Sequence, residues 1–299
     1  MTPAADLDLP RLLNVAGGIL DGVSDHFIAG LGAPSAVRKG DTDFATQIDL
    51  DLERRIGDEL SQRTGFGVHG EEFGGPPVGE GVVWVLDPID GTFNYSAGVP
   101  LTGILLALLA DGESVLGLTW LPLSGKRFAG HLDSPLLCNG EPVALPRPTT
   151  LAQNAIGFGP FNAGHGGRYP GARRADLIRA LSTRVARLRM TGSTGVDMAF
   201  AASGTFGASI AFGRHPWDNA AGAALVRAAG GVATDLSGRR WTVDSPSLVA
   251  GARGIHSEVM AVVEEVIGDD WSVESTGHPP SHPRSDPTGS PSRPEENNR

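Results

Sequence analysis

The sequence predicts a layered α/β fold, and three observations lead to that prediction. Segments with apolar residues at helical spacing alternate along the chain with short apolar runs that are typical of buried strands. Two long helical patterns precede the first strands, so helices are expected to cover one face of a sheet. With 40% hydrophobic and 19% charged residues, the 299-residue chain has the composition of an ordinary globular protein with a sizeable core.

The first half of the chain is expected to be two helices packed on a sheet. In residues 9–31 and 49–60, apolar side chains recur every three or four positions, which predicts two amphipathic helices. A stretch rich in glycine follows at residues 65–81. Strands are predicted around residues 82–86, 103–110 and 115–121.

The run Pro146-Arg-Pro-Thr-Thr150 is typical of a connector, and a second half of the chain follows it. Helices are predicted there around residues 173–182, 196–202, 219–229 and 257–267, and strands around residues 187–190 and 207–212. We therefore expect one folded domain at residues 1–270, with lobes of about 1–146 and 150–270. Residues 271–299, rich in proline, serine, glycine and charge, are predicted to be a disordered tail.

Charge, cysteine content and hydropathy argue against several classes of protein. The formal net charge of -10 disfavours a nucleic-acid partner, since binding to a phosphate backbone relies on basic patches. The single cysteine, Cys138, rules out an internal disulfide and fits a reducing compartment. The apolar run at residues 104–110 is far shorter than the ~20 residues of a membrane span, and the N-terminus lacks a signal-peptide pattern. We expect a cytoplasmic protein with no membrane or nucleic-acid partner.

The most informative stretch is residues 84–95, Trp-Val-Leu-Asp-Pro-Ile-Asp-Gly-Thr-Phe-Asn-Tyr. An apolar strand runs directly into Asp87 and Asp90, whose carboxylates repel each other unless one is protonated or a cation neutralises both. Such oxygen ligands suit Mg²⁺, and the Ile89 carbonyl can add another. The glycine after Asp90 lets backbone N–H groups approach a phosphate, and a threonine hydroxyl follows it. This strand end is predicted to bind divalent cations.

Two further acidic sites are Glu71-Glu72, which follows Val-His-Gly, and Asp218, which lies in Trp217-Asp-Asn-Ala-Ala-Gly222. Each site taken alone has an ordinary explanation: a solvated loop for the glutamates, a helix N-cap for Asp218, and a hairpin turn for Asp90-Gly91. Taken together, the three sites favour metal chemistry.

These motifs make the chain similar to the inositol monophosphatase family of Mg²⁺-dependent, lithium-sensitive phosphatases, over most of residues 9–268. The run Asp87-Pro-Ile-Asp-Gly-Thr-Phe-Asn-Tyr95 resembles the family's first signature, and Trp217-Asp-Asn-Ala-Ala-Gly222 through Ala229-Gly-Gly231 resembles the second. The resemblance implies an αβαβα sandwich of the inositol monophosphatase/fructose-bisphosphatase type and a homodimer. It also implies a small phosphorylated substrate and two or three Mg²⁺ ions in each site.

The roles of individual residues are implied by this resemblance. The implied metal ligands are Glu71, Asp87, the Ile89 carbonyl, Asp90 and Asp218. The implied catalytic residues are Asp49, Thr92, Glu71 and Asp90, among which Asp49 and Thr92 match the pair that orients and deprotonates the attacking water. The implied substrate contacts are Lys39, Gly91, Thr92, Asp197 and Asp218.

The chemistry of phosphate esters supports those roles. Hydrolysis of a phosphate monoester is intrinsically slow, and its transition state spreads negative charge over the phosphoryl oxygens. Two cations ~4 Å apart offset that charge, generate a nucleophile from water and stabilise the leaving alkoxide. No side-chain nucleophile is then needed, which fits a sequence with one cysteine and no Gly-x-Ser-x-Gly. We expect a phosphomonoesterase that acts by direct attack of a metal-activated water.

One position departs from the family pattern. Several inositol phosphatases have a glutamate six residues before the Trp-Asp signature, where this chain has Ala211. A methyl group cannot accept a hydrogen bond from a substrate hydroxyl, which argues against myo-inositol 1-phosphate as the favoured substrate. Polyol, sugar, histidinol and nucleoside monophosphates are the substrate classes that this position does not argue against.

Two alternatives to this function remain. One is a fructose-1,6-bisphosphatase-like sugar phosphatase that uses the same metal chemistry, and the other is a catalytically silent relative that binds a ligand or partner. Other enzyme classes find little support, because the sequence has no Gly-x4-Gly-Lys-Ser/Thr phosphate loop and no His-Glu-x-x-His zinc helix.

Overall fold

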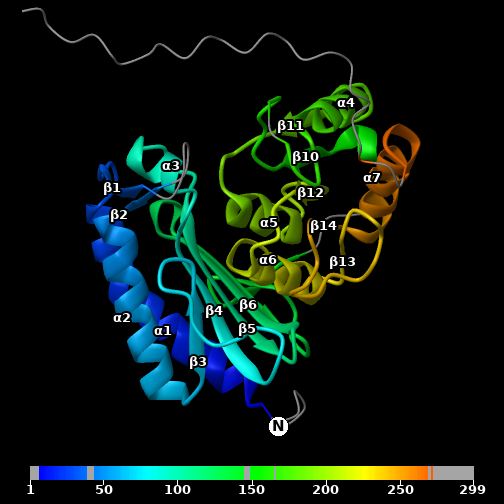
Figure 1. Ribbon diagram of the computed structural model, residues 1–299. Helices are drawn as coiled ribbons and strands as arrows, with labels where there is room; N and C mark the ends of the chain where they lie inside the picture. Colours follow the sequence, from blue (N-terminus) through cyan, green and yellow to red (C-terminus); the bar gives the residue numbers. More distant parts are fainter. Residues whose placement is uncertain (1–6, 39–43, 145–148, 165, 269–270, 272–299) are drawn as a thin grey trace, which may run out of the picture.

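Alternating layers of helix and sheet make up the protein, as a computed structural model shows (Figure 1). The structure describes residues 7–38, 44–144, 149–164, 166–268 and 271. Helices α1 (Leu9–Ala29) and α2 (Gln47–Thr64) form the outermost layer. They cover one face of a large sheet, whose other face carries helices α5 (Thr194–Ala202) and α6 (Pro216–Ala228).

The large sheet has seven strands in the order β3-β4-β5-β6-β7-β8-β9. Its strands are β3 (Gly67–Gly70), β4 (Val82–Asp90), β5 (Gly103–Ala110), β6 (Glu113–Leu121), β7 (Lys126–His131), β8 (Leu137–Cys138) and β9 (Glu141–Pro142). All pairs are antiparallel except β3 with β4. Every residue of β5 is buried, because helices cover the sheet on both faces.

A smaller sheet follows in the second half, in the order β11-β10-β12-β14-β13. Its strands are β10 (Ala155–Phe158), β11 (Arg187–Arg189), β12 (Ala208–Ala211), β13 (Val232–Thr234) and β14 (Leu248–Gly251). Helices α5 and α6 contact one face, while α4 (Gly171–Ser182) and α7 (Arg253–Val266) lie on the other side. The expected αβαβα arrangement is therefore confirmed. A short ribbon of β1 (Ser35–Arg38) and β2 (Phe44–Thr46) leads into α2.

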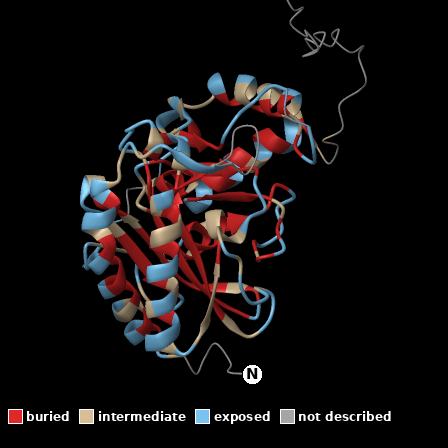
Figure 2. Ribbon diagram, turned by 60° about the vertical axis from the view of Figure 1, so that its left-hand side comes forward, coloured by how far each residue is buried: buried red, intermediate tan, exposed pale blue. Residues whose placement is uncertain are grey.

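Three hydrophobic clusters fill the spaces between these layers, and Figure 2 shows the buried residues running through the sheets. The first lies between α1, α2 and the large sheet. The second joins the large sheet to α5, α6 and β14, so the two expected lobes share one core. The third lies under α4 and α7 and includes Trp271, which packs edge-on against Tyr169 with ring centroids 4.7 Å apart.

The predicted helices are all present, with boundary changes of three or more residues at three of them. Helix α2 ends at Thr64 rather than near residue 60. Helix α6 begins at Pro216 rather than near residue 219, and α7 begins at Arg253 rather than near residue 257. Strands β7, β10, β13 and β14, with the short strands β1, β2, β3, β8 and β9, were not predicted. Within the described ranges, no helix is both apolar and long enough to cross a bilayer. The predicted tail, apart from Trp271, lies outside the described residues.

Candidate active site

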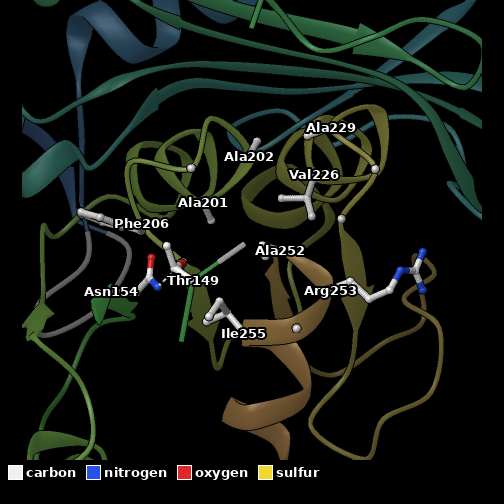
Figure 3. Close-up of a pocket in the computed structure, with 16 residues that line it drawn as sticks. Thr149, Asn154, Ala201, Ala202, Phe206, Val226, Ala229, Ala252, Arg253 and Ile255 are labelled. Atoms are coloured by element: carbon white, nitrogen blue, oxygen red, sulfur yellow. Dashed lines mark hydrogen bonds between the residues drawn. The ribbon is translucent and has the colours of Figure 1, made fainter. Parts of the chain in front are cut away.

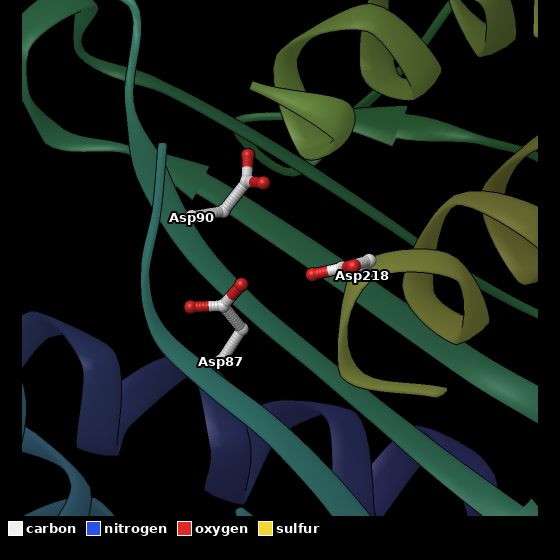
Figure 4. Close-up of side chains that lie close together, drawn as sticks. All are labelled: Asp87, Asp90 and Asp218. Carbon is white, nitrogen blue, oxygen red and sulfur yellow. The ribbon is translucent and has the colours of Figure 1, made fainter. Parts of the chain in front are cut away.

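Strand β4 ends in the two aspartates that the sequence singles out. Its pairing with β5 is irregular between Asp87 and Asp90, which lets both carboxyl groups face the same side (Figure 4). The Ile89 N–H donates to Asp87 Oδ1 at 3.0 Å. Gly91 then adopts a φ of 82°, and helix α3 (Thr92–Ser96) begins, so the alternative of an Asp-Gly hairpin turn is wrong.

Asp218 reaches these carboxylates from the opposite side of the site (Figure 4). Pro216 opens helix α6 and His215 is its N-cap, so Asp218 lies inside the first turn and the N-cap interpretation is wrong. Asp87, Asp90 and Asp218 each offer an oxygen, and these three oxygens lie within 4.8 Å of one another. Two segments that are far apart in the sequence thus form one acidic cluster.

Burial and mutual repulsion disfavour the ionised forms in this cluster. Burial, followed by the charges of Glu71, Asp90, Asp218 and Asp49, raises the pKa of Asp87 well above its usual range. Burial raises the pKa of Asp90 to about 6, although three hydrogen bonds oppose the shift. Cations relieve both costs, and carboxylate oxygens are the donors that Mg²⁺ prefers. The residues present therefore fit a site for divalent cations.

The start of helix α5 holds Asp90 in position. The Ser193 hydroxyl and the Gly195 N–H (2.8 Å) donate to Asp90 Oδ2, and the Thr194 N–H donates to Oδ1 at 3.1 Å. A carboxylate at a helix N-terminus also interacts favourably with the helix dipole. Asp90 is therefore fixed by an element from the second half of the chain.

Asp49 and Thr92 lie next to each other, and their role in activating water stays a prediction. The Thr92 hydroxyl lies 3.4 Å from Asp49 Oδ1 and 3.0 Å from the Ile89 carbonyl. Thr46, the N-cap of α2, donates to Asp49 Oδ2 from its N–H (2.8 Å) and its hydroxyl (2.5 Å). Burial is the main reason that the pKa of Asp49 is raised. One oxygen of Asp49 is anchored, and the other faces Thr92.

Glu71 follows β3, where its N–H donates to the Leu86 carbonyl of β4 at 3.2 Å. Its charge contributes to the raised pKa of Asp87, so it acts electrostatically on the cluster. The buried carboxylate of Glu53 on α2 accepts from the backbone N–H groups of Glu72 (2.8 Å) and Phe73 (2.9 Å). The loop after β3 is therefore tied to α2, and the alternative of a freely solvated loop does not describe it.

The other predicted substrate residues are placed differently. Asp197 is buried on α5, where it accepts from the Thr191 hydroxyl at 2.8 Å, and burial raises its pKa to about 8. Its contact with substrate stays a prediction. Lys39 lies outside the described residues.

A pocket of about 360 Å³ opens beside the acidic cluster, with Asp218 in its wall. Its other lining residues include Ala211, Phe212, Arg174 and Arg214. A second cavity, of about 270 Å³, lies between the ends of α5 and α6 and the start of α7, lined largely by glycine, alanine and other apolar residues (Figure 3). The acidic cluster does not line that second cavity.

The sequence did not identify the residues that support the acidic side chains. Thr46 stands three positions before Asp49, a spacing typical of a helix N-terminal capping box, which would have revealed it. Ser193 precedes α5 as an N-cap, but its contact with Asp90 depends on tertiary structure. Arg174, which lines the pocket and does not contact the cluster, was not identified either, because an arginine in a helical segment is usually a surface residue.

Comparisons with known proteins agree with this geometry. The sequence profile of the inositol monophosphatase family matches residues 13–267. An inositol-1-monophosphatase of Mycolicibacterium smegmatis, ImpA, is 51% identical over 267 residues, which cover 88% of this chain and 97% of the relative. A probable inositol 1-monophosphatase of Mycobacterium tuberculosis, also named ImpA, is 48% identical over 255 residues, which cover 85% and 94%. The solved structure of an inositol monophosphatase from Thermotoga maritima matches with a TM-score of 0.77 at 28% identity, covering 85% of this chain and 97% of that one.

Proposed function

The chain belongs to the inositol monophosphatase family of phosphoric monoester hydrolases, and from that premise we propose that it hydrolyses a small phosphomonoester at the acidic cluster. The observation that carries this proposal is the convergence of Asp87, Asp90 and Asp218, whose oxygens lie within 4.8 Å of one another. A cluster of buried carboxylates is unfavourable unless cations bind to it, and cations bound there would stabilise the charge that develops in phosphoryl transfer.

Two or three Mg²⁺ ions would be held by Glu71, Asp87, the Ile89 carbonyl, Asp90 and Asp218. When bound, they supply positive charge that lowers the pKa of a water molecule and offsets the charge of the phosphoryl oxygens. The protein keeps the ligands in place through the contacts of Asp90 with α5 and of the loop after β3 with Glu53. These contacts fix the oxygens before the cations arrive, which reduces the reorganisation that binding requires.

Asp49 and Thr92 would orient the attacking water and accept its proton. The Thr92 hydroxyl lies 3.4 Å from Asp49 Oδ1 and 3.0 Å from the Ile89 carbonyl. It can therefore donate a hydrogen bond to one of these oxygens while it accepts a hydrogen bond from water. The raised pKa of Asp49 makes its carboxylate a stronger base than an exposed aspartate. The backbone N–H groups of Gly91 and Thr92, at the start of α3, would contact the phosphate.

The leaving group would occupy the pocket of about 360 Å³ beside Asp218. Its size suits a small metabolite rather than a macromolecule. Ala211 lies in its wall, so the hydrogen-bond acceptor that a glutamate would provide is missing there. This supports a substrate other than myo-inositol 1-phosphate among the polyol, sugar, histidinol and nucleoside monophosphates.

The proposal is tested by phosphate release from a panel of these monoesters with Mg²⁺, with chelator, and with Li⁺ as inhibitor. We expect release that needs Mg²⁺ and that falls by orders of magnitude in Asp90→Asn, which removes charge without changing volume. Folding is checked in parallel by circular dichroism. Chelator-resistant release, or near-wild-type turnover in Asp90→Asn, would contradict the mechanism. A folded wild-type protein that releases no phosphate would favour the catalytically silent alternative.

A further inference from the structure

Arg174 is a buried cation beside the acidic cluster, and nothing in the proposed hydrolysis uses it. It lies on α4 with 8% of its surface exposed. Its Nε donates to the Tyr169 carbonyl at 2.8 Å, and its Nη1 donates to the Pro160 carbonyl at 3.0 Å. The guanidinium also lies over the Phe212 ring, 4.5 Å from the ring centroid.

The positive charge of Arg174 is not balanced by a carboxylate. Its hydrogen-bond partners are neutral carbonyl groups, and it forms no ion pair with any of the residues that the structure describes. Burial lowers the pKa of Arg174, and no neighbouring carboxylate offsets that effect. Burying an uncompensated charge is costly, so such a residue is retained where a negative ligand compensates it.

The pocket that Arg174 lines is where a negatively charged ligand would bind. Arg174 and Asp218 line the same pocket of about 360 Å³, and Arg214 lines it as well. Asp218 is the only carboxylate among the described residues of its wall, and in the proposed function its charge is taken up by cations. A phosphate held at the cluster therefore places the rest of the substrate between a cation site and a buried guanidinium.

We propose that Arg174 is a specificity-determining residue, which binds a second anionic group, a carboxylate or a phosphate, on the leaving group of the substrate. This inference rests on the proposed phosphatase function and names the class of its substrate. A guanidinium held by two carbonyls and an aromatic ring is fixed in orientation and suited to either anion. The same charge disfavours a cationic leaving group, such as the amine of histidinol phosphate.

Matched substrate pairs test the inference in the wild-type enzyme. 3-Phosphoglycerate differs from glycerol 3-phosphate by a carboxylate in place of a hydroxymethyl group, and fructose 1,6-bisphosphate differs from fructose 1-phosphate by a second phosphate. We expect kcat/KM to be at least about tenfold higher for the anionic member of one pair, since a hydrogen bond to a charged group contributes about 10- to 100-fold. The pair that shows the preference identifies the anion. Ratios near one in both pairs would overturn the inference.

Variants of Arg174 separate recognition from structure. Arg174→Gln removes the charge, shortens the side chain and keeps an amide group with two of the five N–H donors. In this variant we expect the kcat/KM ratio to fall toward one through a higher KM, with kcat nearly unchanged. Arg174→Lys keeps the charge and should retain part of the preference. Arg179→Gln, on the exposed side of the same helix, is the matched control and should keep the wild-type ratio.

The outcomes also separate this inference from the proposed function. Chelator-sensitive release from glycerol 3-phosphate without any preference for an anionic partner leaves the phosphatase intact and overturns the role of Arg174. An undiminished preference in Arg174→Gln does the same. Absence of release from these four substrates and from the whole panel of monoesters overturns both. If Arg174→Gln does not fold, the wild-type ratios and Arg174→Lys still decide the matter, because a lysine without any preference would contradict recognition by charge.

Discussion

Replacing Asp87 by Asn should change the free energy of unfolding differently in the absence and in the presence of cations. Asp87 is 2% exposed, and oxygens of Asp87, Asp90 and Asp218 lie within 4.8 Å of one another. Two unit charges at that distance repel by at least about 3 kcal/mol at an effective dielectric constant of about 20. Asn has the same shape and still accepts a hydrogen bond from the Ile89 N–H, but it carries no charge.

Protonation of Asp87 does not free the wild-type protein of this repulsive free energy, because protonation is itself unfavourable. Protonating Asp87 costs about 1.4 kcal/mol for each pH unit above its unfolded pKa of about 4, so above about pH 6.5 it is at least as unfavourable as the repulsion. We therefore expect the Asp87→Asn protein to be more stable than wild type in chelator by about 3 kcal/mol. With Mg²⁺ the difference in stability between the two proteins should shrink or change sign, because wild type gains binding free energy that the variant has lost.

Urea unfolding followed by tryptophan fluorescence measures both effects. Asp58→Asn, at an exposed position of α2, is the control for the chemical change alone. A variant that is less stable than wild type in chelator would refute the electrostatic reasoning. Equal stabilisation of both proteins by Mg²⁺ would refute the assignment of Asp87 as a ligand.

Three further predictions concern the same site. In Gly195→Ala the added methyl would overlap the Leu105 side chain and lie 2.8 Å from Asp90 Oδ2, so turnover at saturating Mg²⁺ should fall by about 100-fold; near-normal turnover would mean that Asp90 tolerates displacement. Ala211→Glu should raise kcat/KM for myo-inositol 1-phosphate and weaken any preference for anionic leaving groups, since the new carboxylate lines the pocket of Arg174; unchanged values would show that another residue sets substrate choice. In chelator, the free energy of unfolding should fall as pH rises from about 4 to about 8. The reason is that the folded pKa values of Asp90 (about 6) and Asp197 (about 8) lie above the unfolded ones. A free energy of unfolding that stays constant or rises over this pH range would contradict those shifts.

The segments that the sequence predicted well are those whose burial repeats along the chain. Residues 103–110 form β5 with the predicted bounds, because this run of apolar residues is covered on both faces. Strands such as β13 (Val232–Thr234) and β14 (Leu248–Gly251) were missed, since they are short and exist through pairing with residues distant in sequence. The early start of α6 was missed although Pro216 occupies a position that favours proline.

The site divides in the same way between local and distant information. Asp87 and Asp90 lie three residues apart at the end of a buried strand, so their proximity could be predicted from spacing alone. Two other features depend on the packing of α5 and α6 on the large sheet: the proximity of Asp218 to these aspartates, and the hydrogen bond from the Ser193 hydroxyl to Asp90. Those positions were predicted by family resemblance or not at all, because no periodic pattern encodes a contact between two halves of the chain.

The charges of the site fall into two groups with different partners. At the cluster, Asp87, Asp90 and Asp218 carry negative charge, so without cations they repel one another and would also repel a phosphate. Arg174 carries positive charge that no cation can neutralise, and it attracts an anion whether or not the cluster is loaded. A substrate with one phosphate and no other charge satisfies the first group and leaves the second unpaired. A substrate with anions at both ends satisfies both, and this difference is the physical basis for selection among small phosphomonoesters.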